Sequence, residues 1–333
     1  MKKVLVTGAT GGLGRNAVEY LLEKGVQVVA TGRDQQRGAQ LEAAGAKFVR
    51  ADLSHRGPGV LESLVDGVDA VWHCAALSSP WGAYADFAAA NIHATANLVE
   101  AAGLAKVPNF VHISTPALYF DYSHNLDIPE SFRAERYVNH YAATKAVAET
   151  TVQKGVLRFP NTRHVILRPR AIFGPYDQVL LPRLDSLRQE HRGRIPLPRG
   201  GRTVLDLTYA ANVAHAMWLA STARAVTSGS VYNVTNDSPQ QIGEVLEQLY
   251  AQRGQSFAVK RVPYPVLALA ARVMERISRL TAREPKFTRY SIGALAYDMT
   301  LDVSKIKAEL GYVPIVSMDE GIRLTAEWMK KHG

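Results

Sequence analysis

The first part of the chain alternates short apolar runs with segments whose apolar residues recur at helical spacing. Residues 2–25, KKVLVTGATGGLGRNAVEYLLEKG, begin as an apolar strand, pass through a glycine-rich turn and end in an amphipathic helix. Two further strands, VQVVATGRD and AKFVRADL, follow at residues 26–34 and 46–53. Strands that alternate with helices in this way predict an α/β fold with a parallel sheet and helices on both of its faces.

Glycines punctuate the first turn at Gly8, Gly11 and Gly14. Glycine lets the backbone turn tightly, approach a pyrophosphate and pack a helix against a strand, while the free amides and positive end of the helix attract the anion. The spacing is G-x-x-G-x-x-G, which differs from the usual G-x-G-x-x-G. The strand before the turn and the helix after it favour dinucleotide binding over an ordinary glycine loop.

The end of the second strand predicts which dinucleotide binds. An acidic residue there would accept the 2′-hydroxyl of NAD, but the strand ends in Gly32 and Arg33. Arg33 suits a 2′-phosphate, and Arg15 lies in the first turn of the glycine helix, where a cation opposes the helix dipole unless an anion is near. These arginines favour NADP(H). NAD(H) stays open as the alternative, because both also fit ordinary surface positions and Asp34 is one residue further on. Asp52, after the third strand, is a candidate for the adenine amine.

The stretch YAATKAVAE holds the candidate proton donor. Tyr141 and Lys145 are four residues apart, which places them on one helical face. A cation beside a phenol favours the phenolate, so proton exchange with a substrate hydroxyl becomes feasible near neutral pH. The same spacing also arises by chance, as a half-buried ring beside a solvated amine. Its place downstream of a dinucleotide-binding turn favours the catalytic interpretation.

Together these motifs resemble the extended short-chain dehydrogenase/reductases of the epimerase/dehydratase superfamily, over nearly the whole chain. Further segments that resemble the family are VWHCAAL (71–77), NIHATANLVEAA (91–102), FVHISTPALYF (110–120), ILRPRAIFGP (166–175), VYNVTND (231–237) and LDVSKIKAELGYVP (301–314). The resemblance implies that Thr115 completes the catalytic group with Tyr141 and Lys145, counted back from Leu118 and Tyr119. Ser114 is the alternative.

The resemblance also implies which residues surround the cofactor, with His73 beside them. They are Gly8, Thr10, Gly11, Gly12, Leu13, Gly14, Arg15, Gly32, Arg33, Asp52, Leu53, Cys74, Ala75, Ala76, Asn91, Ile113, Ser114, Tyr141, Lys145, Pro169, Ala171 and Ile172. Lys145 would hold the nicotinamide ribose as well as lowering the pKa of Tyr141.

The departures from the family pattern bear on the substrate. Nucleotide-sugar epimerases and dehydratases carry an Asn and an Arg that grip the substrate diphosphate, where this chain has Ala171 and Leu205 before Asp206. Arg170 or Arg202 could replace that grip. FGPYDQVLLPRL and LDLTYAANVAHAMWLA resemble instead the branch of 3β-hydroxysteroid dehydrogenases, sterol-carboxylate dehydrogenases and 2-alkyl-3-oxoalkanoate reductases, whose substrates are hydrophobic. Candidate substrate contacts, each also compatible with packing alone, are Ser79, Trp81, Tyr84, Phe120, Tyr122, Arg170 and Phe173.

At 333 residues the chain exceeds the usual size of one domain. We expect a Rossmann-type doubly wound body of residues 1–175 and 202–238, which binds NAD(P), and a smaller, discontinuous C-terminal substrate-binding part of residues 176–201 and 239–333. In the latter, VPYPVLALAARVMERISRL predicts an apolar helix with arginines on one side. It is suited to roofing a hydrophobic pocket, or it is a lid or core helix without a ligand role.

The composition and charge of the chain indicate which kinds of partner it binds. The net charge is +9, with basic residues dense in residues 183–202, but no interleaved aromatics or nucleic-acid motif accompany them, so we expect no nucleic-acid partner. The histidines show no metal-ligand spacing, and no metal is expected. Cys74 is the single cysteine and is expected to be a small buried filler more than a nucleophile. The start shows no secretory signal, and no apolar run suffices to span a membrane, so we expect a cytoplasmic protein with peripheral membrane contact possible.

The sequence therefore predicts an NAD(P)-dependent oxidoreductase that interconverts a secondary alcohol and a ketone on a hydrophobic, steroid-like or alkanoate-like substrate. A nucleotide-sugar epimerase or dehydratase is the first alternative, and a non-catalytic dinucleotide-binding redox sensor is the second. Relatives often dimerise through helices of the sheet domain, so a homodimer is also expected, although residues 140–155 show no decisive apolar stripe.

Overall fold

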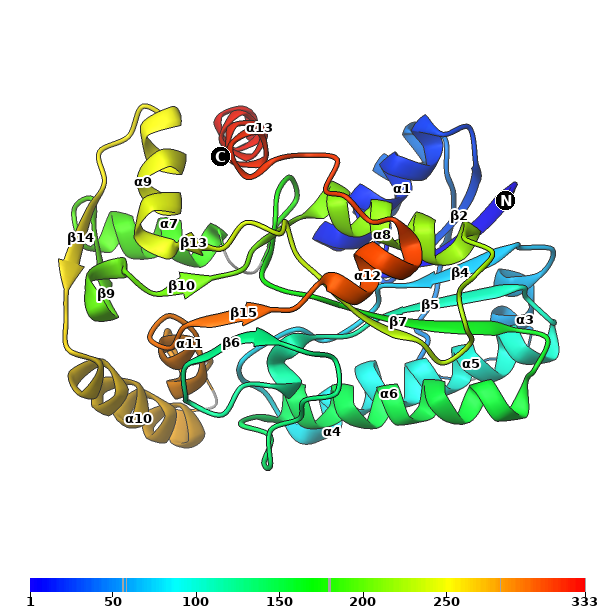
Figure 1. Cartoon of the computed structure of the whole chain (residues 1–333), viewed down its shortest axis with the longest axis horizontal. Coiled ribbons are helices and arrows are strands. Elements are labelled where there is room, and N and C mark those ends of the chain that lie inside the picture. The colour runs from blue at the N-terminus through cyan, green and yellow to red at the C-terminus, as the bar shows by residue number, and fades with distance from the viewer. Residues whose placement is uncertain (56, 58, 179–180, 282, 333) are drawn as a thin grey trace.

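The computed structural model describes residues 1–55, 57, 59–178, 181–281 and 283–332. A seven-stranded parallel sheet forms its centre (Figure 1). Its strands, from one edge to the other, are β12 (Val231–Val234), β7 (Arg163–Pro169), β5 (Asn109–Ile113), β4 (Ala70–His73), β1 (Lys3–Thr7), β2 (Gln27–Gly32) and β3 (Lys47–Arg50).

Helices cover both faces of this sheet. They are α1 (Gly12–Glu23), α2 (Gln35–Ala43), α3 (Val60–Val65), α4 (Tyr84–Phe87), the π-helical η1 (Ala88–His93), α5 (Ala94–Leu104), α6 (His140–Arg158) and α8 (Ala210–Thr222). Alternate side chains of a strand point to opposite faces, so Val4 and Val6 of β1 pack with α1, α2 and α8, whereas Leu5 packs with α3, α5 and α6. Because both faces are buried, the strands read as nearly continuous apolar runs. The predicted doubly wound Rossmann-type fold is confirmed.

A smaller part lies beyond the carboxyl ends of the parallel strands (Figure 1). Its strands are β6 (Asn125–Ile128), β8 (Ile172–Phe173), β9 (Arg194–Leu197), β10 (Val204–Leu205), β11 (Thr208–Tyr209), β13 (Gln240–Gln241), β14 (Ala258–Arg261) and β15 (Met299–Leu301). Its helices, with those of the closing segment, are η2 (Pro116–Leu118), α7 (Leu181–Glu190), η3 (Pro198–Gly201), α9 (Ile242–Gln252), α10 (Tyr264–Thr281), α11 (Arg289–Ala294), α12 (Ser304–Leu310) and α13 (Met318–His332).

The closing segment returns to the sheet. Val303, Ile306 and Tyr312, in and around α12, share the hydrophobic core of α1 and α8, so this stretch of the predicted substrate-binding part packs on the nucleotide-binding side. Positions 56 and 58 of the predicted body, and 179–180, 282 and 333 of the predicted substrate-binding part, lie outside the described residues.

Helix α10 is oriented differently from the expected roof of a pocket. Five of its large apolar side chains form a stripe that is 48–88% exposed, made of Val266, Leu269, Val273, Ile277 and Leu280. The side facing the protein carries the partly buried Leu267 and Met274 and the buried Ala271 and Ser278. Glu275 is buried there in an ion pair with Arg289 at 2.9 Å, so this side anchors the helix and the apolar stripe faces outward. In the described part of the chain, no helix is long and apolar enough to cross a membrane.

Candidate active site

The glycine turn between β1 and α1 is built as an anion cradle. Gly8 has a φ of +64°, and a Cβ added there would lie 2.7 Å from the Cα of Ala75. A Cβ on Gly14 would lie 2.2 Å from the Gly8 carbonyl oxygen, so neither position accepts a side chain. The cap residue of α1, Gly11, brings no capping side chain, and the first-turn amides of a helix have no partner within the helix. These features fit a dinucleotide pyrophosphate bound at the amides of Gly12 and Leu13.

The loop that follows β8 packs onto this turn. Asn16 of α1 donates to the Pro175 carbonyl oxygen at 2.9 Å, and the Tyr176 carbonyl oxygen would be 2.8 Å from a Cβ on Gly12. The Arg15 guanidinium lies 3.9 Å from the centre of the Tyr176 ring and pairs with Glu19 at 3.3 Å. Arg15 thus has partners within the chain that stabilise it without a bound phosphate.

The end of β2 gathers further arginines. A Cβ on Gly32 would lie 2.6 Å from the Thr10 hydroxyl oxygen, so the strand end and the glycine turn are in close contact. Asp34 caps α2 by accepting the Arg37 amide at 3.0 Å, and its carboxylate pairs with the Arg37 guanidinium at 3.4 Å. Arg33 is exposed beside it. Sequence reasoning missed Arg37; its place in the first turn of the helix after β2 is the signal that could have found it.

Asp52 and Leu53, the residues expected near the adenine, already form hydrogen bonds within the protein. The Asp52 carboxylate accepts hydrogen bonds from the hydroxyl and the amide of Ser54. These bonds hold the pKa of Asp52 below its ordinary value, and the bond from the hydroxyl has the larger effect. Leu53 is buried, and its carbonyl oxygen accepts a hydrogen bond from Asn97 at 3.0 Å.

The end of β4 is tied to the elements on either side of it. His73 forms hydrogen bonds with the hydroxyl groups of Thr7, at 2.7 Å, and Thr95, at 2.9 Å. Burial lowers the pKa of His73 to about 3, so the ring is neutral. Burial raises the pKa of the Cys74 thiol to about 12, which fits the predicted filler and not a nucleophile. Asn91 is fully buried, bonds to both backbone groups of Leu77 and donates to Thr144 of α6 at 3.0 Å. It positions the loop that includes Ala75 and Ala76.

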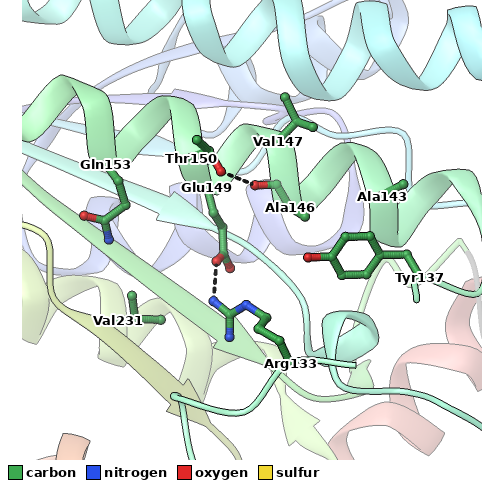
Figure 2. Close-up of a pocket in the computed structure, with 9 residues that line it drawn as sticks. All are labelled: Arg133, Tyr137, Ala143, Ala146, Val147, Glu149, Thr150, Gln153 and Val231. Atoms are coloured by element: carbon green, nitrogen blue, oxygen red, sulfur yellow. Dashed lines mark hydrogen bonds and ion pairs between the residues drawn. The ribbon is translucent and has the colours of Figure 1, made fainter. Parts of the chain in front are cut away.

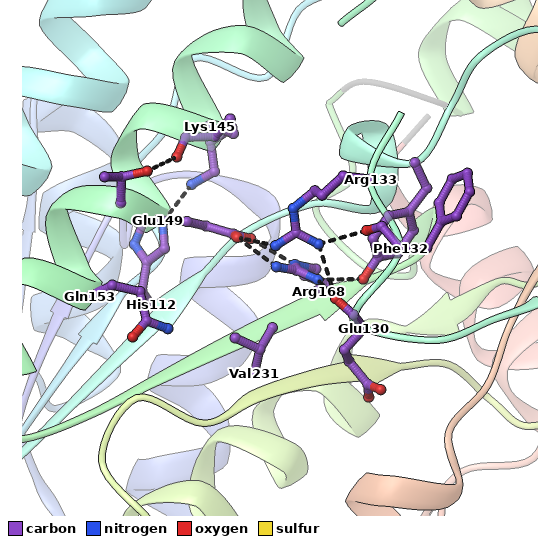
Figure 3. Close-up of polar contacts among 12 residues, drawn as sticks. His112, Glu130, Phe132, Arg133, Lys145, Glu149, Gln153, Arg168 and Val231 are labelled. Carbon is purple, nitrogen blue, oxygen red and sulfur yellow. Dashed lines mark hydrogen bonds and ion pairs between the residues drawn. The ribbon is translucent and has the colours of Figure 1, made fainter. Parts of the chain in front are cut away.

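Lys145 is fixed at the carboxyl end of β5. Its side chain is 1% exposed, and Nζ donates to the Ile113 carbonyl oxygen at 2.6 Å and lies 3.0 Å from the His112 Nε2 (Figure 3). Burial lowers the pKa of Lys145 to about 8, while nearby Glu149 and Cys74 favour the charged form. The pKa of His112 lies well below its usual value because of burial, so its ring nitrogen is available as an acceptor.

One helical turn further along α6, Glu149 anchors a buried ion pair. Both of its oxygens accept from the guanidinium of Arg168, at 2.7 and 2.6 Å, and one also pairs with Arg133 at 3.0 Å (Figure 3). Arg168 on β7 is fully buried and donates to the Tyr119 hydroxyl and the Glu130 carbonyl oxygen as well. Sequence reasoning missed this network, although Glu149 lies in the YAATKAVAE stretch itself.

Tyr141 lies in the first turn of α6, which Asn139 caps by accepting the Ala142 amide at 2.8 Å. In the described residues no group hydrogen-bonds to its hydroxyl. Thr115 is buried at the end of β5 and caps η2, accepting the Ala117 amide at 3.1 Å. The Ser114 hydroxyl lies near the Glu149 carboxylate and lowers the pKa of that acid, against the larger effect of burial. The two candidates for the third catalytic residue thus face different neighbours.

The predicted substrate residues fall into three groups. Phe120 and Tyr122 belong to a cluster of aromatic rings with Tyr290 and Tyr297, at centroid distances of 4.9 to 6.3 Å. Phe173 is buried and packs on Tyr209 in a hydrophobic core. Ser79 bonds to the Trp81 backbone, the Trp81 ring lies 5.9 Å from the Arg279 guanidinium of α10, and Tyr84 packs edge-on against His140. Arg170 lies within electrostatic range of Tyr290 in the aromatic cluster.

A hollow of about 450 Å³ lies along the side of α6 (Figure 2). Arg133, Tyr137, Gln153 and Val231 line it together with α6 residues that include Glu149. Tyr141, Lys145 and Thr115 are not part of its lining, so it is separate from the candidate reaction centre. Across the part of the chain that the structure describes, no group of three His, Cys, Asp or Glu side chains could hold a metal ion.

Known proteins resemble this chain in sequence. A family model described as the NAD dependent epimerase/dehydratase family matches residues 4–235. The chain is 45% identical to the uncharacterized protein YbjS of Escherichia coli K12, covering 99% of this chain and 98% of that protein. It is 33% identical to the 2-alkyl-3-oxoalkanoate reductase of Stenotrophomonas maltophilia, covering 96% of this chain and 97% of that protein. The resemblance to the reductase branch is confirmed.

Solved structures resemble its fold. The UDP-glucuronic acid 4-epimerase of Bacillus cereus, in complex with NAD, aligns with a TM-score of 0.78 at 22% identity, covering 99% of this chain and 96% of that chain. At this identity the likeness shows a shared fold and not a shared substrate.

Proposed function

Because the chain belongs to the NAD dependent epimerase/dehydratase family of extended short-chain dehydrogenase/reductases, we propose that this NAD-binding enzyme interconverts a secondary alcohol and a ketone on a hydrophobic substrate. The observation that carries the proposal is the placement of Tyr141 one helical turn from a buried Lys145, at the strand ends that meet the glycine turn. Thr115 at the end of β5 is the proposed third member.

Each of these residues has a distinct task. Tyr141 takes the proton from the substrate hydroxyl in oxidation and returns it in reduction, while Thr115 hydrogen-bonds the same oxygen. Burial lowers the pKa of Lys145 to about 8, so Lys145 is charged at neutral pH one helical turn from Tyr141, and it is proposed to hold the nicotinamide ribose. The nicotinamide, when bound, supplies or accepts the hydride at the carbinol carbon.

NADP(H) is the favoured cofactor. Arg33 is exposed at the end of β2 and carries this argument, because Arg37 beside it already pairs with Asp34 and donates to Thr10 and Gln178. Asp34 is engaged as the cap of α2 rather than free to accept a ribose hydroxyl. The argument from Arg15 is weaker than the sequence indicated, because Glu19 and Tyr176 already stabilise that cation. NAD(H) is the alternative.

The substrate is proposed to be a hydrophobic 3-oxo or 3-hydroxy compound. The reductase from Stenotrophomonas maltophilia, named for 2-alkyl-3-oxoalkanoates, supports this class. Tyr122 and Tyr290, which pack on the buried Phe120, are partly exposed and offer aromatic surface to such a substrate. A nucleotide-sugar epimerase or dehydratase is the alternative. Ala171 and the buried Leu205 stand where such enzymes carry their diphosphate contacts, and Arg202 is exposed and donates to the Arg199 carbonyl oxygen. A redox sensor would not need all three catalytic residues.

We also propose that this cytoplasmic enzyme contacts anionic membranes through α10 and that it forms a homodimer. The exposed apolar stripe of α10 is flanked on one side by Arg272, Arg276 and Arg279, which is the arrangement of helices that lie on anionic membrane surfaces. The positive charge of the whole chain acts in the same direction. A homodimer is supported by exposed Leu104 of α5 and Leu157 of α6.

The test is a fluorescence titration of the purified protein with NADPH and NADH, followed by turnover of apolar ketones and 3-hydroxy compounds. A preference for NADPH of about tenfold, roughly 1.4 kcal/mol, supports the assignment of the arginines. Preference for NADH would place the NAD alternative first. Absence of binding for both nucleotides would refute the enzyme proposal, and tight binding of uridine diphosphate would favour the epimerase.

A further inference from the structure

The backbone of Arg170 is fixed where the chain leaves the parallel sheet. Its amide donates to the Val234 carbonyl oxygen at 3.1 Å, and its own carbonyl oxygen accepts from the Thr208 hydroxyl at 2.6 Å. The next residue, Ala171, has a φ of +42°, a left-handed conformation that is unusual for a residue with a side chain. Arg170 is therefore presented by a well-defined bend between β7 and β8.

The side chain of Arg170 has no anionic or hydrogen-bonding partner among the described residues. Its Nε is buried and unpaired. Two other arginines also have an unpaired buried Nε, but Arg253 pairs with Asp185 at 2.7 Å and Arg188 lies 3.9 Å from the same acid. Arg168, two residues earlier, is fully paired. Arg170 as a whole is partly exposed, so a ligand can reach its guanidinium, and an anion from outside the chain would supply the acceptor that the buried Nε lacks.

The sheet places Arg170 beside the reaction centre, because β7 pairs with β5 up to Leu167, whose carbonyl oxygen accepts the Ser114 amide at 2.7 Å, and Arg170 follows three residues later. Burial raises the pKa of Tyr290 to about 12, and Arg170 opposes that shift while Tyr141 and Tyr122 add to it, so all three lie within electrostatic range of Tyr290. The proposed proton donor and the unpaired cation thus share one neighbour. The apolar rings of Phe120 and Tyr122 belong to the same cluster.

Asp206 does not neutralise Arg170. Its carboxylate accepts the Leu301 amide at 2.7 Å, and it forms no ion pair with the guanidinium. Burial raises the pKa of Asp206 to about 6, although Arg170 favours the charged form. A diphosphate would be poorly accommodated, because one guanidinium with an acid nearby provides too little positive charge for it. A single carboxylate matches the charge of one guanidinium and its planar, bidentate geometry.

We propose that Arg170 binds a carboxylate of the substrate, so that the enzyme acts on a hydrophobic 3-hydroxy or 3-oxo acid held between Arg170 and Tyr141. This inference rests on the proposed function. In oxidation, the carbinol C–H bond breaks with transfer of a hydride to the oxidised nicotinamide, the hydroxyl proton passes to Tyr141, and a ketone forms. The carboxylate is unchanged and serves to orient the acid.

The first experiment compares an acid with its neutral ester. Oxidation of 3-hydroxydecanoate and of its methyl ester is measured for the wild type, Arg170→Met, Arg170→Lys and the control Arg224→Met, which removes an exposed cation. Hydroxy acids are used because 3-oxo acids lose carbon dioxide. A charge-assisted bond worth about 1.5–3 kcal/mol predicts that Arg170→Met lowers kcat/KM for the acid by about 10- to 150-fold and for the ester by less than about threefold.

Arg170→Lys is expected to retain part of the acid activity, because it keeps the charge but loses the bidentate geometry. Equal losses for acid and ester in Arg170→Met would overturn the inference. A thermal melt of each variant checks folding, and removal of an unpaired cation is expected to leave the melting temperature unchanged or higher.

A second experiment needs neither nucleotide nor turnover. Calorimetric binding of octanoate and of octan-1-ol is measured for the same proteins. Octanoate binding that Arg170→Met weakens about tenfold or more, with octan-1-ol unaffected, supports the inference even if turnover fails and the proposed function falls. A wild type that turns over neutral ketones but does not bind octanoate would overturn the inference and leave the proposed function standing. Uridine diphosphate binding that requires Arg170 would also overturn it.

Discussion

The Nζ of Lys145 donates to the carbonyl oxygen of Ile113 at 2.6 Å, which ties helix α6 to the end of strand β5. An ammonium group has three donors, and His112 is the partner of a second one. One donor of Lys145 therefore remains for a cofactor ribose or the phenol of Tyr141. The bond also fixes the register of α6 against the sheet, and with it the position of Tyr141.

Tyr141→Phe is expected to lower kcat by about 10²- to 10⁴-fold, because the phenol is the proposed proton donor. The fold should be unchanged, because the Tyr141 hydroxyl has no hydrogen-bond partner among the described residues. The dissociation constant of the nucleotide should stay within about threefold, since Lys145 and the glycine turn are unchanged. Turnover is followed by nicotinamide absorbance and binding by fluorescence. Tyr137→Phe, an exposed tyrosine on the same segment, is the control. Full activity in Tyr141→Phe would remove the assignment.

Activity in the reductive direction is expected to fall above a pH of about 8. Burial lowers the pKa of Lys145 to about 8, so the charged form predominates below that pH and is lost above it. Each further pH unit should lower kcat/KM about tenfold. A pH profile that stays flat to pH 10 would contradict the role of Lys145.

The same group affects stability with a defined sign. Between pH 8 and the ordinary lysine pKa of 10.5, the unfolded chain binds more protons at Lys145 than the folded chain does, so the contribution of this residue to the free energy of unfolding rises with pH. Lys145→Met should flatten that rise in urea denaturation measured across this range.

Arg33→Ala combined with Arg37→Ala is expected to raise the dissociation constant of NADPH by about tenfold or more and that of NADH by less than about twofold, because only NADPH carries the 2′-phosphate. Fluorescence titrations with both nucleotides measure the two effects. Arg158→Ala, at the far end of α6, removes an exposed arginine as a control. Equal effects on the two nucleotides would assign the arginines to general electrostatics and not to the phosphate.

The sheet and the glycine turn could be predicted from sequence because their determinants are local. Apolar runs mark the strands, the φ of +64° at Gly8 belongs to the turn itself, and Gly14 is required by its contact with the Gly8 carbonyl oxygen in the same turn. Tyr141 and Lys145 could be predicted together because one helical turn joins them. The pairing of Glu149 with Arg168 could not, since the two residues are 19 positions apart and meet only when α6 packs on the sheet.

The direction in which helix α10 faces could not be predicted from the sequence pattern either. The apolar stripe of α10 was visible in the sequence, but whether it faces a pocket or the outside depends on how Glu275 and Arg289 pair. Arg170 gave no signal of its unpaired state, because the absence of a partner is a property of the assembled chain.

Glu149→Gln is expected to lower the free energy of unfolding by about 3–5 kcal/mol, because it leaves the fully buried Arg168 without its carboxylate. Urea denaturation at neutral pH measures the change. Glu190→Gln, in an exposed pair with Lys286, is the matched control and should cost less than about 1 kcal/mol. A loss of similar size in both variants would show that the buried pair contributes no more than a surface one.

The outward stripe of α10 is expected to carry the protein onto anionic membranes. Leu269→Gln with Ile277→Gln removes two side chains that are 62% and 54% exposed, so neither change should disturb the core. Each fully buried leucine or isoleucine contributes about 1.5–3 kcal/mol, so the pair should weaken vesicle binding by about tenfold or more. Co-sedimentation is measured with phosphatidylcholine vesicles that contain or lack phosphatidylglycerol. Leu126→Gln, a 61% exposed leucine on β6, is the matched control and should bind like the wild type.

Replacing the arginines beside the apolar stripe of α10 distinguishes binding to a membrane from binding to another apolar partner. Arg272→Gln with Arg276→Gln should weaken binding only to vesicles that contain phosphatidylglycerol, and added salt should have the same effect on the wild type, because surface charges are screened within about 10 Å at moderate ionic strength. If the wild type does not sediment with either kind of vesicle but changes its oligomeric state when Leu269 and Ile277 are replaced, the stripe is covered by a second copy of the chain. Binding that depends on Leu269 and Ile277 but is indifferent to lipid charge would leave the arginines without a membrane role.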